Sequence, residues 1–197
     1  YGYVKVAAAI PSGMVADIGL NLQQIESTIA LEEGRGVEVI VFPELCITGY
    51  TCQDLFQQQV LLDEAEGAII KLLDFTRQLD IICIVGVPAE VGNVLLNCAA
   101  VIQKGELLGL IPKTYLPNYG EFYEKRWFAS SVQIKPCEVH YAGSRVMVTN
   151  EHVVFRTWEG MQFGVEICED VWAPTPPSNG LALAGAGIVF NLSASDE

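Results

Sequence analysis

The sequence predicts a mixed α/β protein in which helices and sheets form layers around one core. Short, wholly apolar runs such as residues 37–42 favour strands that are buried on both faces. Two longer stretches with helical spacing of apolar residues alternate with such runs in the first half of the chain. The middle of the chain carries paired apolar runs joined by short turns, as in β-hairpins. Alternation followed by hairpins is typical of a sheet that is covered by helices.

The first half of the chain contains three predicted strands and two predicted helices. The side chain of Asp17 can cap the first helix, whose apolar residues recur on one face until Gly34 and Gly36 stop it. Pro43 ends the strand that follows. The predicted elements are a strand at 3–10, a helix from 18 to about 33, a strand at 37–42, a helix at 61–79 and a strand at 81–87.

The second half is predicted to be richer in hairpins. One hairpin turns about Lys104-Gly105, and Pro112 ends its second strand. Residues 118–128 mix aromatic and charged side chains with no clean period. The predicted elements are strands at 94–102, 106–111, 145–149 and 152–156, the latter two as a hairpin, then a strand at 162–167, a helix at 181–186 and a strand at 188–191.

Composition limits the class of protein. The 197 residues suffice for one sizeable domain, and the net charge of −13 argues against a surface for nucleic acid or an anionic membrane. No apolar run is long enough to span a membrane. Six cysteines without Cys-x-x-Cys spacing and two histidines argue against a metal site, and a core this apolar needs no disulfides. We therefore expect a cytoplasmic protein without a metal, and both ends of the chain look trimmed.

Three chemically capable residues follow predicted strands. Glu44 and Lys113 each come after a proline that ends an apolar strand, and Cys168 directly follows the strand at 162–167. If these strands run side by side, the three side chains converge in one crevice at the edge of the sheet. Each residue alone has an ordinary interpretation, as a loop carboxylate, a surface lysine or a core thiol. The three together favour a catalytic site.

The chemistry of such a trio is coherent. A carboxylate can take the thiol proton and later return it to a leaving amine. A lysine ammonium can stabilise both a thiolate and an oxyanion. The cysteine can then attack a carbonyl carbon and carry the acyl group.

Several motifs in the sequence resemble those of the nitrilase (carbon–nitrogen hydrolase) superfamily. The motifs are Phe42-Pro43-Glu44-Leu45 with Thr48-Gly49-Tyr50, then Pro112-Lys113-Thr114-Tyr115-Leu116-Pro117, then Glu166-Ile167-Cys168-Glu169-Asp170. The resemblance implies a Glu-Lys-Cys triad on a four-layer α-β-β-α sandwich, here cut short at the C-terminus. Residues 115–126, 174–178 and 191–195 are further similar to the glutaminase domain of glutamine-dependent NAD synthetases.

This narrower resemblance implies further site residues. Glu121 matches the family's second glutamate, which helps orient the substrate amide, and Glu124 is the competing candidate. Four more residues match positions that line the glutamine pocket, although an aromatic side chain there could equally be core and a carboxylate could equally favour a helix N-terminus. These four are Tyr119, Glu169, Trp172 and Ser195. A substrate-binding arginine expected soon after Ser195 lies past Glu197.

The resemblance also implies an activity. Residues 1–197 would be an incomplete glutaminase domain that releases ammonia through a cysteine thioester, with no cofactor of its own. The ammonia would pass to a C-terminal NAD synthetase domain that uses ATP and Mg and is absent here, and the family suggests a homo-oligomer. Two alternatives stay open. One is a stand-alone nitrilase-type amidohydrolase, such as a carbamoylase or aliphatic amidase, and the other is a catalytically inactive interaction domain.

Overall fold

A computed structural model describes residues 3–195, which form ten strands, three α-helices and five short 3-10 helices. The strands are β1 (Val6–Ala8), β2 (Val39–Val41), β3 (Ile82–Val91), β4 (Val94–Gln103), β5 (Glu106–Pro112), β6 (Cys137–Tyr141), β7 (Ser144–Val148), β8 (Phe155–Arg156), β9 (Gln162–Ile167) and β10 (Ile188–Leu192). The α-helices are α1 (Ile18–Gly34), α2 (Gln59–Phe75) and α3 (Pro177–Leu183). The 3-10 helices are η1 (Tyr50–Gln57), η2 (Thr76–Gln78), η3 (Glu124–Arg126), η4 (Ser131–Gln133) and η5 (Cys168–Trp172).

The strands form two main sheets and a separate hairpin. The larger sheet has the order β1-β2-β3-β4-β5, with β1, β2 and β3 parallel and β4 antiparallel to both of its neighbours. The second sheet has the order β10-β9-β8, with β10 and β9 parallel. Strands β6 and β7 pair with each other. Because β5 therefore runs in the same direction as β2, these two strands end at the same edge of the larger sheet.

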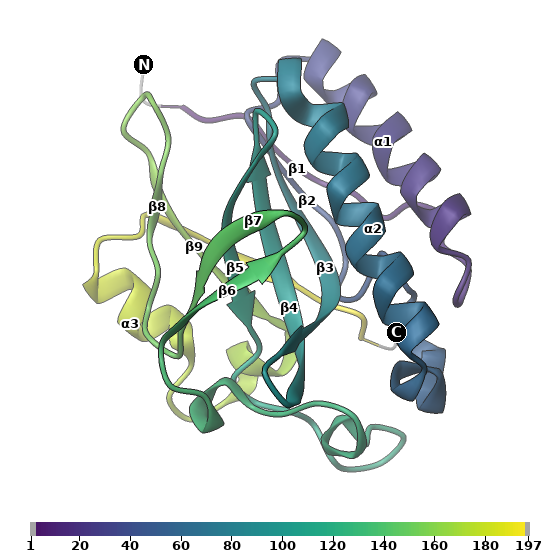
Figure 1. Ribbon diagram of the computed structural model, residues 1–197. Coiled ribbons are helices and arrows are strands. Elements are labelled where there is room, and N and C mark those ends of the chain that lie inside the picture. Colours follow the sequence, from purple (N-terminus) through teal and green to yellow (C-terminus); the bar gives the residue numbers. More distant parts are fainter. Residues whose placement is uncertain (1–2, 196–197) are drawn as a thin grey trace.

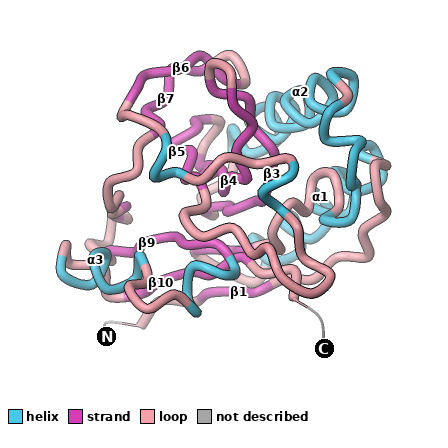
Figure 2. Tube along the Cα trace, turned by 90° about the horizontal axis from the view of Figure 1, so that it is seen from below, coloured by secondary structure: helices cyan, strands magenta, loops and turns pink. Residues whose placement is uncertain are grey.

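The elements stack as four layers. Figure 1 shows α1 and α2 on one side, the two sheets in the middle and α3 on the opposite side. Figure 2, seen from below, separates the β9–β10 layer from the layer of β3, β4 and β5. One apolar cluster lies between α1, α2 and the larger sheet, and a second fills the space between the two sheets. The predicted α-β-β-α sandwich is confirmed.

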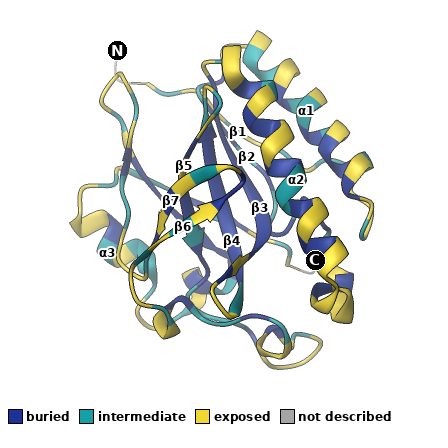
Figure 3. Cartoon of the chain, in the orientation of Figure 1, coloured by how far each residue is buried: buried dark blue, intermediate teal, exposed yellow. Residues whose placement is uncertain are grey.

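Burial follows this layering. Strands β3 and β4 are buried along most of their length, as short, wholly apolar strands predict, whereas the outer faces of α1 and α2 are exposed (Figure 3). The side chain of Asp17 accepts a hydrogen bond from Leu20 N, so α1 begins at the predicted cap. None of the helices within residues 3–195 is long and apolar enough to cross a membrane.

One predicted hairpin is wrong, and one helix is displaced. The predicted strand at 145–149 pairs backwards with β6 through a turn at Ala142-Gly143, rather than forwards with 152–156. The short β8 pairs with β9 instead. Helix α3 begins at Pro177, earlier than the predicted 181–186, because a proline fits the first turn of a helix.

Candidate active site

A buried lysine lies at the centre of the candidate site. Lys113 follows the end of β5, and its side chain is fully buried. Its Nζ donates to Oε1 of Glu44 at 2.6 Å and to Oε1 of Glu124 at 2.7 Å. Both carboxylates are also buried. A buried charge has to be paired, and here one cation neutralises part of the charge of two anions.

A neutral donor gives a second hydrogen bond to one oxygen of each carboxylate. Asn97 Nδ2 donates to Glu44 Oε1 at 2.7 Å, and the hydroxyl of Tyr50 donates to Glu124 Oε1 at 2.7 Å. The other oxygen of each carboxylate, together with Asn97 Oδ1, has no hydrogen-bond partner within the described residues. The cluster therefore presents three buried acceptors, and these can receive donors from a substrate.

The pKa shifts follow from burial and charge. Burial would lower the pKa of Lys113, but the charges of Glu44 and Glu124 outweigh it, so the pKa is raised. Burial and then the charge of Glu44 raise the pKa of Glu124, against the opposite effect of Lys113. Burial raises the pKa of Tyr50, and the charges of Glu124, Glu44 and Cys168 raise it further. This last shift means that Cys168 lies within electrostatic reach of the same cluster.

The loop that carries Glu44 is pressed against strand β3. Ile47 N donates to the carbonyl of Gly86 at 3.2 Å, and Leu45 is fully buried with a positive φ of 51°. A Cβ added at Gly86 would lie 2.2 Å from Leu45 N and 2.6 Å from the carbonyl oxygen of Pro43. Glycine at this position therefore lets the loop approach closely enough to bring Glu44 to Lys113.

Replacing Gly86 with alanine is expected to displace this loop. The overlap is with backbone atoms, so the cost should be about 1–3 kcal/mol in the free energy of unfolding, as for other overpacked cores. Urea unfolding measures that cost, and catalytic activity should fall because Glu44 moves away from Lys113. Gly67→Ala in α2 is the matched control, because nothing lies within 4 Å of its added Cβ. That variant should gain about 0.5–1 kcal/mol from helix propensity. Equal stability of the two variants would contradict the argument.

Cys168 begins η5 immediately after β9, with a positive φ of 45°. A non-glycine residue in this region is strained, and such strain is concentrated at functional sites. Its Sγ lies 3.6 Å from Ser195 Oγ, and Asn191 Nδ2 donates to its carbonyl oxygen at 3.3 Å. Asn191 belongs to β10, which pairs with β9, so the second sheet holds the strained turn.

Asp170 ties the turn of Cys168 to the segment after Lys113. Its Oδ1 accepts from the backbone N–H groups of Thr114 and Tyr115, at 3.0 and 2.7 Å, and its Oδ2 accepts from Ile167 N at 3.0 Å. Burial raises the pKa of Asp170 to about 6, although these donors and the charge of Lys113 lower it. One carboxylate thus links the end of β9 to the end of β5.

The family model for carbon–nitrogen hydrolases matches residues 5–196. The chain belongs to the carbon–nitrogen hydrolase family. The glutamine-dependent NAD(+) synthetase of Mycobacterium tuberculosis is 34% identical over 201 residues, which cover 99% of this chain and 29% of the relative. The chain therefore spans less than a third of the length of that relative.

Solved structures agree with this membership. The glutamine-dependent NAD+ synthetase of Acinetobacter baumannii, in complex with ADP, superposes with a TM-score of 0.83 at 29% identity, covering 98% of this chain and 33% of that one. An amidase from Nesterenkonia sp. gives a TM-score of 0.78 at 23% identity, covering 98% of this chain and 66% of that one. At that identity the amidase supports the fold alone.

The three strands that lead to the predicted trio do not all run side by side. Strands β2 and β5 belong to the larger sheet with β3 and β4 between them, whereas β9 belongs to the second sheet. The trio is approached from two facing sheets, so the condition that the three strands run side by side is not met. The direct contact of Lys113 with Glu44 is present despite this difference.

The remaining predicted residues differ in their contacts and in their exposure. Tyr119 donates its hydroxyl to Glu169 Oε2 at 2.8 Å, and Ser195 contacts the thiol of Cys168. Trp172 is 77% exposed, which excludes the alternative that it is a core residue. Of the two competing glutamates, Glu121 is exposed, whereas Glu124 is buried against Lys113. The structure thus brings Glu124, and not Glu121, into an ion pair with Lys113.

Sequence reasoning missed Asn97, Tyr50 and the linking role of Asp170. Asn97 carried a usable signal, because a single amide inside the apolar run of β4 needs a buried partner. Tyr50 and Asp170 carried none beyond their place in motifs. Their partners, Glu124 and the Thr114–Tyr115 backbone, are 74 and 55–56 residues away along the chain.

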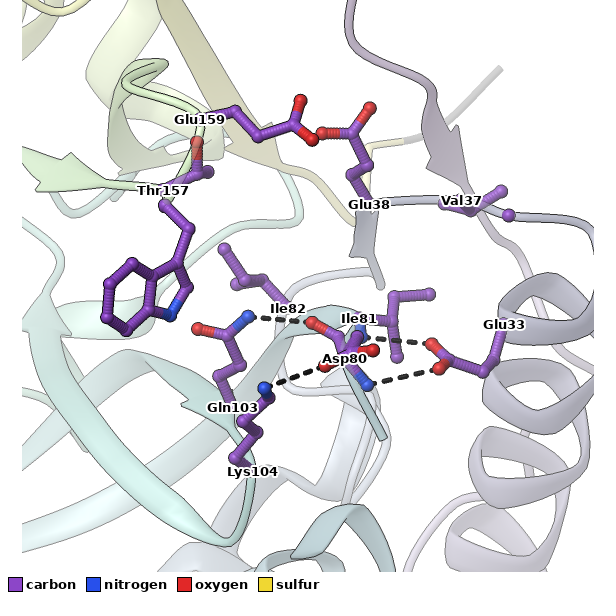
Figure 4. Close-up of a pocket in the computed structure, with 12 residues that line it drawn as sticks. Glu33, Val37, Glu38, Asp80, Ile81, Ile82, Gln103, Lys104, Thr157 and Glu159 are labelled. Carbon is purple, nitrogen blue, oxygen red and sulfur yellow. Dashed lines mark hydrogen bonds and ion pairs between the residues drawn. The ribbon is translucent and has the colours of Figure 1, made fainter. Parts of the chain in front are cut away.

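A hollow of about 380 Å³ lies at the opposite edge of the larger sheet. Figure 4 shows the Glu33 carboxylate turned toward the backbone N–H groups of Asp80 and Ile81, and Lys104 turned toward Asp80. The ion pair between Lys104 Nζ and Asp80 Oδ1 is 2.7 Å long. The side chains of Glu33, Gln103 and Lys104 therefore all bind Asp80 or Ile81 within the hollow. None of the predicted site residues lines this hollow.

Proposed function

We propose that this chain hydrolyses the side-chain amide of glutamine, with Cys168 as nucleophile, Glu44 as general base and Lys113 as the electrostatic stabiliser. The observation that carries the proposal is the fully buried Lys113 between two carboxylates, in a chain of the carbon–nitrogen hydrolase family. Asp170 links the segment after Lys113 to the strained turn of Cys168. Burying a cluster of charged side chains costs desolvation free energy, and such clusters concentrate at active sites.

Acylation begins with a proton transfer. Glu44 accepts the proton of the Cys168 thiol, and the sulfur attacks the amide carbon, so that an S–C bond forms and the carbonyl π electrons move to oxygen. The tetrahedral intermediate collapses as the C–N bond breaks. Glu44 returns its proton to the leaving nitrogen, so ammonia departs and a γ-glutamyl thioester remains on Cys168.

Water completes the cycle. Glu44 takes a proton from a water molecule, whose oxygen attacks the thioester carbon. The S–C bond breaks, glutamate is released, and the proton returns to the sulfur. Atoms balance as one glutamine and one water giving one glutamate and one ammonia.

Lys113 has the donors that this cycle needs. An ammonium carries three N–H groups, and two of them are used by Glu44 and Glu124. The third is free for the oxyanion of each tetrahedral intermediate. We assign the role of second glutamate to Glu124, whose Oε2 has no partner among the described residues and can accept an N–H of the substrate amide.

The choice of glutamine rests on the relatives and on the four residues predicted to line the glutamine pocket. Relatives at 31–34% identity are named glutamine-dependent NAD(+) synthetases. We assign the substrate's amino-acid end to Tyr119, Glu169, Trp172 and Ser195. Ser195 contacts the thiol of Cys168, and Tyr119 binds Glu169, which follows Cys168 in the chain. The ammonia would serve an NAD synthetase domain, where ATP and Mg belong to the amidation step.

A substrate panel tests the proposal. Glutamine should give equimolar glutamate and ammonia, at a kcat/KM well above that for an aliphatic amide or an N-carbamoyl amino acid. Preference for either of the others would favour the stand-alone amidohydrolase. Failure to hydrolyse any of the three, with intact folding, would favour an inactive interaction domain.

Metal removal is expected to leave hydrolysis unchanged. The nucleophile, the base and the oxyanion donor of the proposed cycle are all side chains, so no step needs a bound metal. The initial rate with glutamine should be the same before and after dialysis against EDTA. Loss of activity on dialysis, with recovery on adding zinc, would refute this part of the proposal.

A further inference from the structure

We propose that Asn97 is a positioning residue that determines which oxygen of Glu44 acts as the base. The inference rests on the proposed function, because it concerns how that base is held. Asn97 is 1% exposed and lies in β4, between Leu96 and Cys98, which are fully buried. No part of the proposed cycle requires an amide at this position, yet a buried amide is retained inside an apolar strand.

The two oxygens of Glu44 differ sharply in their partners. Oε1 accepts from Lys113 Nζ at 2.6 Å and from Asn97 Nδ2 at 2.7 Å. A carboxylate oxygen has two lone pairs in its plane, so Oε1 has no capacity left for a proton. Oε2 is buried and has no partner within residues 3–195. A proton can therefore be taken only at Oε2.

Strand geometry explains how Asn97 reaches Glu44. Side chains alternate along β4, and Ala99 and Val101 belong to the core between the two sheets. Asn97 shares their face, so it is the polar end of that face at the edge where β5 ends. Its backbone carbonyl also accepts from Lys113 N at 2.8 Å. A single residue thus fixes both the backbone of Lys113 and the carboxylate of Glu44.

Lys113 alone cannot hold the carboxylate in one orientation. Its ammonium is shared with Glu124, whose own Oε1 also accepts from Tyr50. The groups that titrate or carry charge around Glu44 are Lys113, Glu124, Tyr50 and, within electrostatic reach, Cys168. Asn97 adds a neutral donor from a second direction, and two donors at an angle stop the carboxylate from rotating.

Removing the Asn97 amide should change which oxygen of Glu44 can hold a proton. Without Asn97 Nδ2, Oε1 gains a free lone pair, and a carboxylate that loses a donor holds its proton more tightly. The proton would then reside on either oxygen, and on Oε1 it cannot be exchanged with the Cys168 thiol. The defect should therefore be worst at acid pH and should disappear as the carboxyl ionises.

Two variants separate this role from a structural one. Asn97→Leu removes the donor and leaves the backbone carbonyl that accepts from Lys113. Asn97→Asp keeps the shape but donates to Oε1 only while the new carboxyl is protonated. Asn93→Asp, at an exposed position in the β3–β4 turn, is the control for the added charge. Each protein is assayed from pH 5 to 9 for glutamine hydrolysis and for alkylation of Cys168 by iodoacetamide.

The Asn97→Leu and Asn97→Asp variants should show opposite pH trends. For Asn97→Leu, the loss relative to wild type should be greatest, at about tenfold, at the acid end of both profiles and should shrink toward the alkaline end, with little change in KM. For Asn97→Asp, the rates should lie within about threefold of wild type at pH 5.5 and at least about tenfold below it at pH 8.5. Asn93→Asp should follow the wild-type profiles.

The outcomes also distinguish failure of the positioning role of Asn97 from failure of the proposed function. A loss in Asn97→Leu that is equal at every pH, or an Asn97→Asp profile parallel to wild type, overturns the positioning role. If wild-type protein alkylates at Cys168 but does not hydrolyse glutamine, the proposed function fails while the alkylation profiles still decide the role of Asn97. If wild-type Cys168 does not react, both fail.

Discussion

Replacing Cys168 with alanine is expected to lower kcat for glutamine hydrolysis by at least about 10⁴-fold, because loss of a nucleophile removes the covalent route altogether. Folding should be nearly unaffected, since alanine keeps the Cβ and, within residues 3–195, the side chain of Cys168 makes one hydrogen-bond contact. Steady-state kinetics with glutamine and a urea unfolding curve check the two halves of this expectation.

Chemical labelling tests whether Cys168 is the reactive cysteine. A glutamine-mimicking electrophile should modify Cys168 in the wild-type protein, as mapped by mass spectrometry. Cys83 and Cys98 are fully buried, and burial raises the pKa of each thiol, so both should be inert. Cys137→Ala is the matched control, because this half-buried cysteine lies in the β6–β7 hairpin. The control should keep full activity and full labelling. Labelling that falls mainly on another cysteine would contradict the assignment.

Local signals allowed much of the fold to be predicted. The Asp17 cap and the wholly apolar strand at 37–42 are set by contacts within a few residues, and both are present in the structure. The wrong hairpin shows where local signals fail. Strand β7 turns back through Ala142-Gly143, and both residues have positive φ. Alanine rarely adopts this conformation, so Ala142 is a weak signal for a turn.

The candidate site likewise contains residues that local sequence signals could locate and residues that they could not. Glu44 and Lys113 could be located because each follows a proline at the end of an apolar strand. Their donors could not, since Asn97 and Glu44 are 53 residues apart and only the packing of β4 against the Glu44 loop brings them together. The choice between Glu121 and Glu124 was equally inaccessible. It depends on how an aperiodic segment folds over Lys113, and no periodicity describes that path.

Replacing Lys113 with methionine is expected to abolish hydrolysis and also to destabilise the fold. The change leaves Glu44 and Glu124 buried without their cation, and breaking a buried ion pair in this way costs about 3–5 kcal/mol. In the wild type the raised pKa of Lys113 means that its stabilising charge is present at neutral pH and is lost only when the pH rises through that raised value. Urea unfolding at pH 7 measures the cost.

The pH dependence of this variant gives the argument a second test. Buried carboxylates without a cation hold protons more tightly in the folded state than in the unfolded state, so the stability of Lys113→Met should fall further between pH 5 and pH 8. Adding Glu124→Gln removes one of the two stranded charges, so the double variant should regain part of the stability and none of the activity. Lys104→Met is the matched control, because Lys104 pairs with Asp80 at the surface, where an ion pair contributes little. A Lys113→Met protein that is as stable as this control at every pH would show that the charged cluster is not the buried, coupled unit on which the proposed mechanism depends.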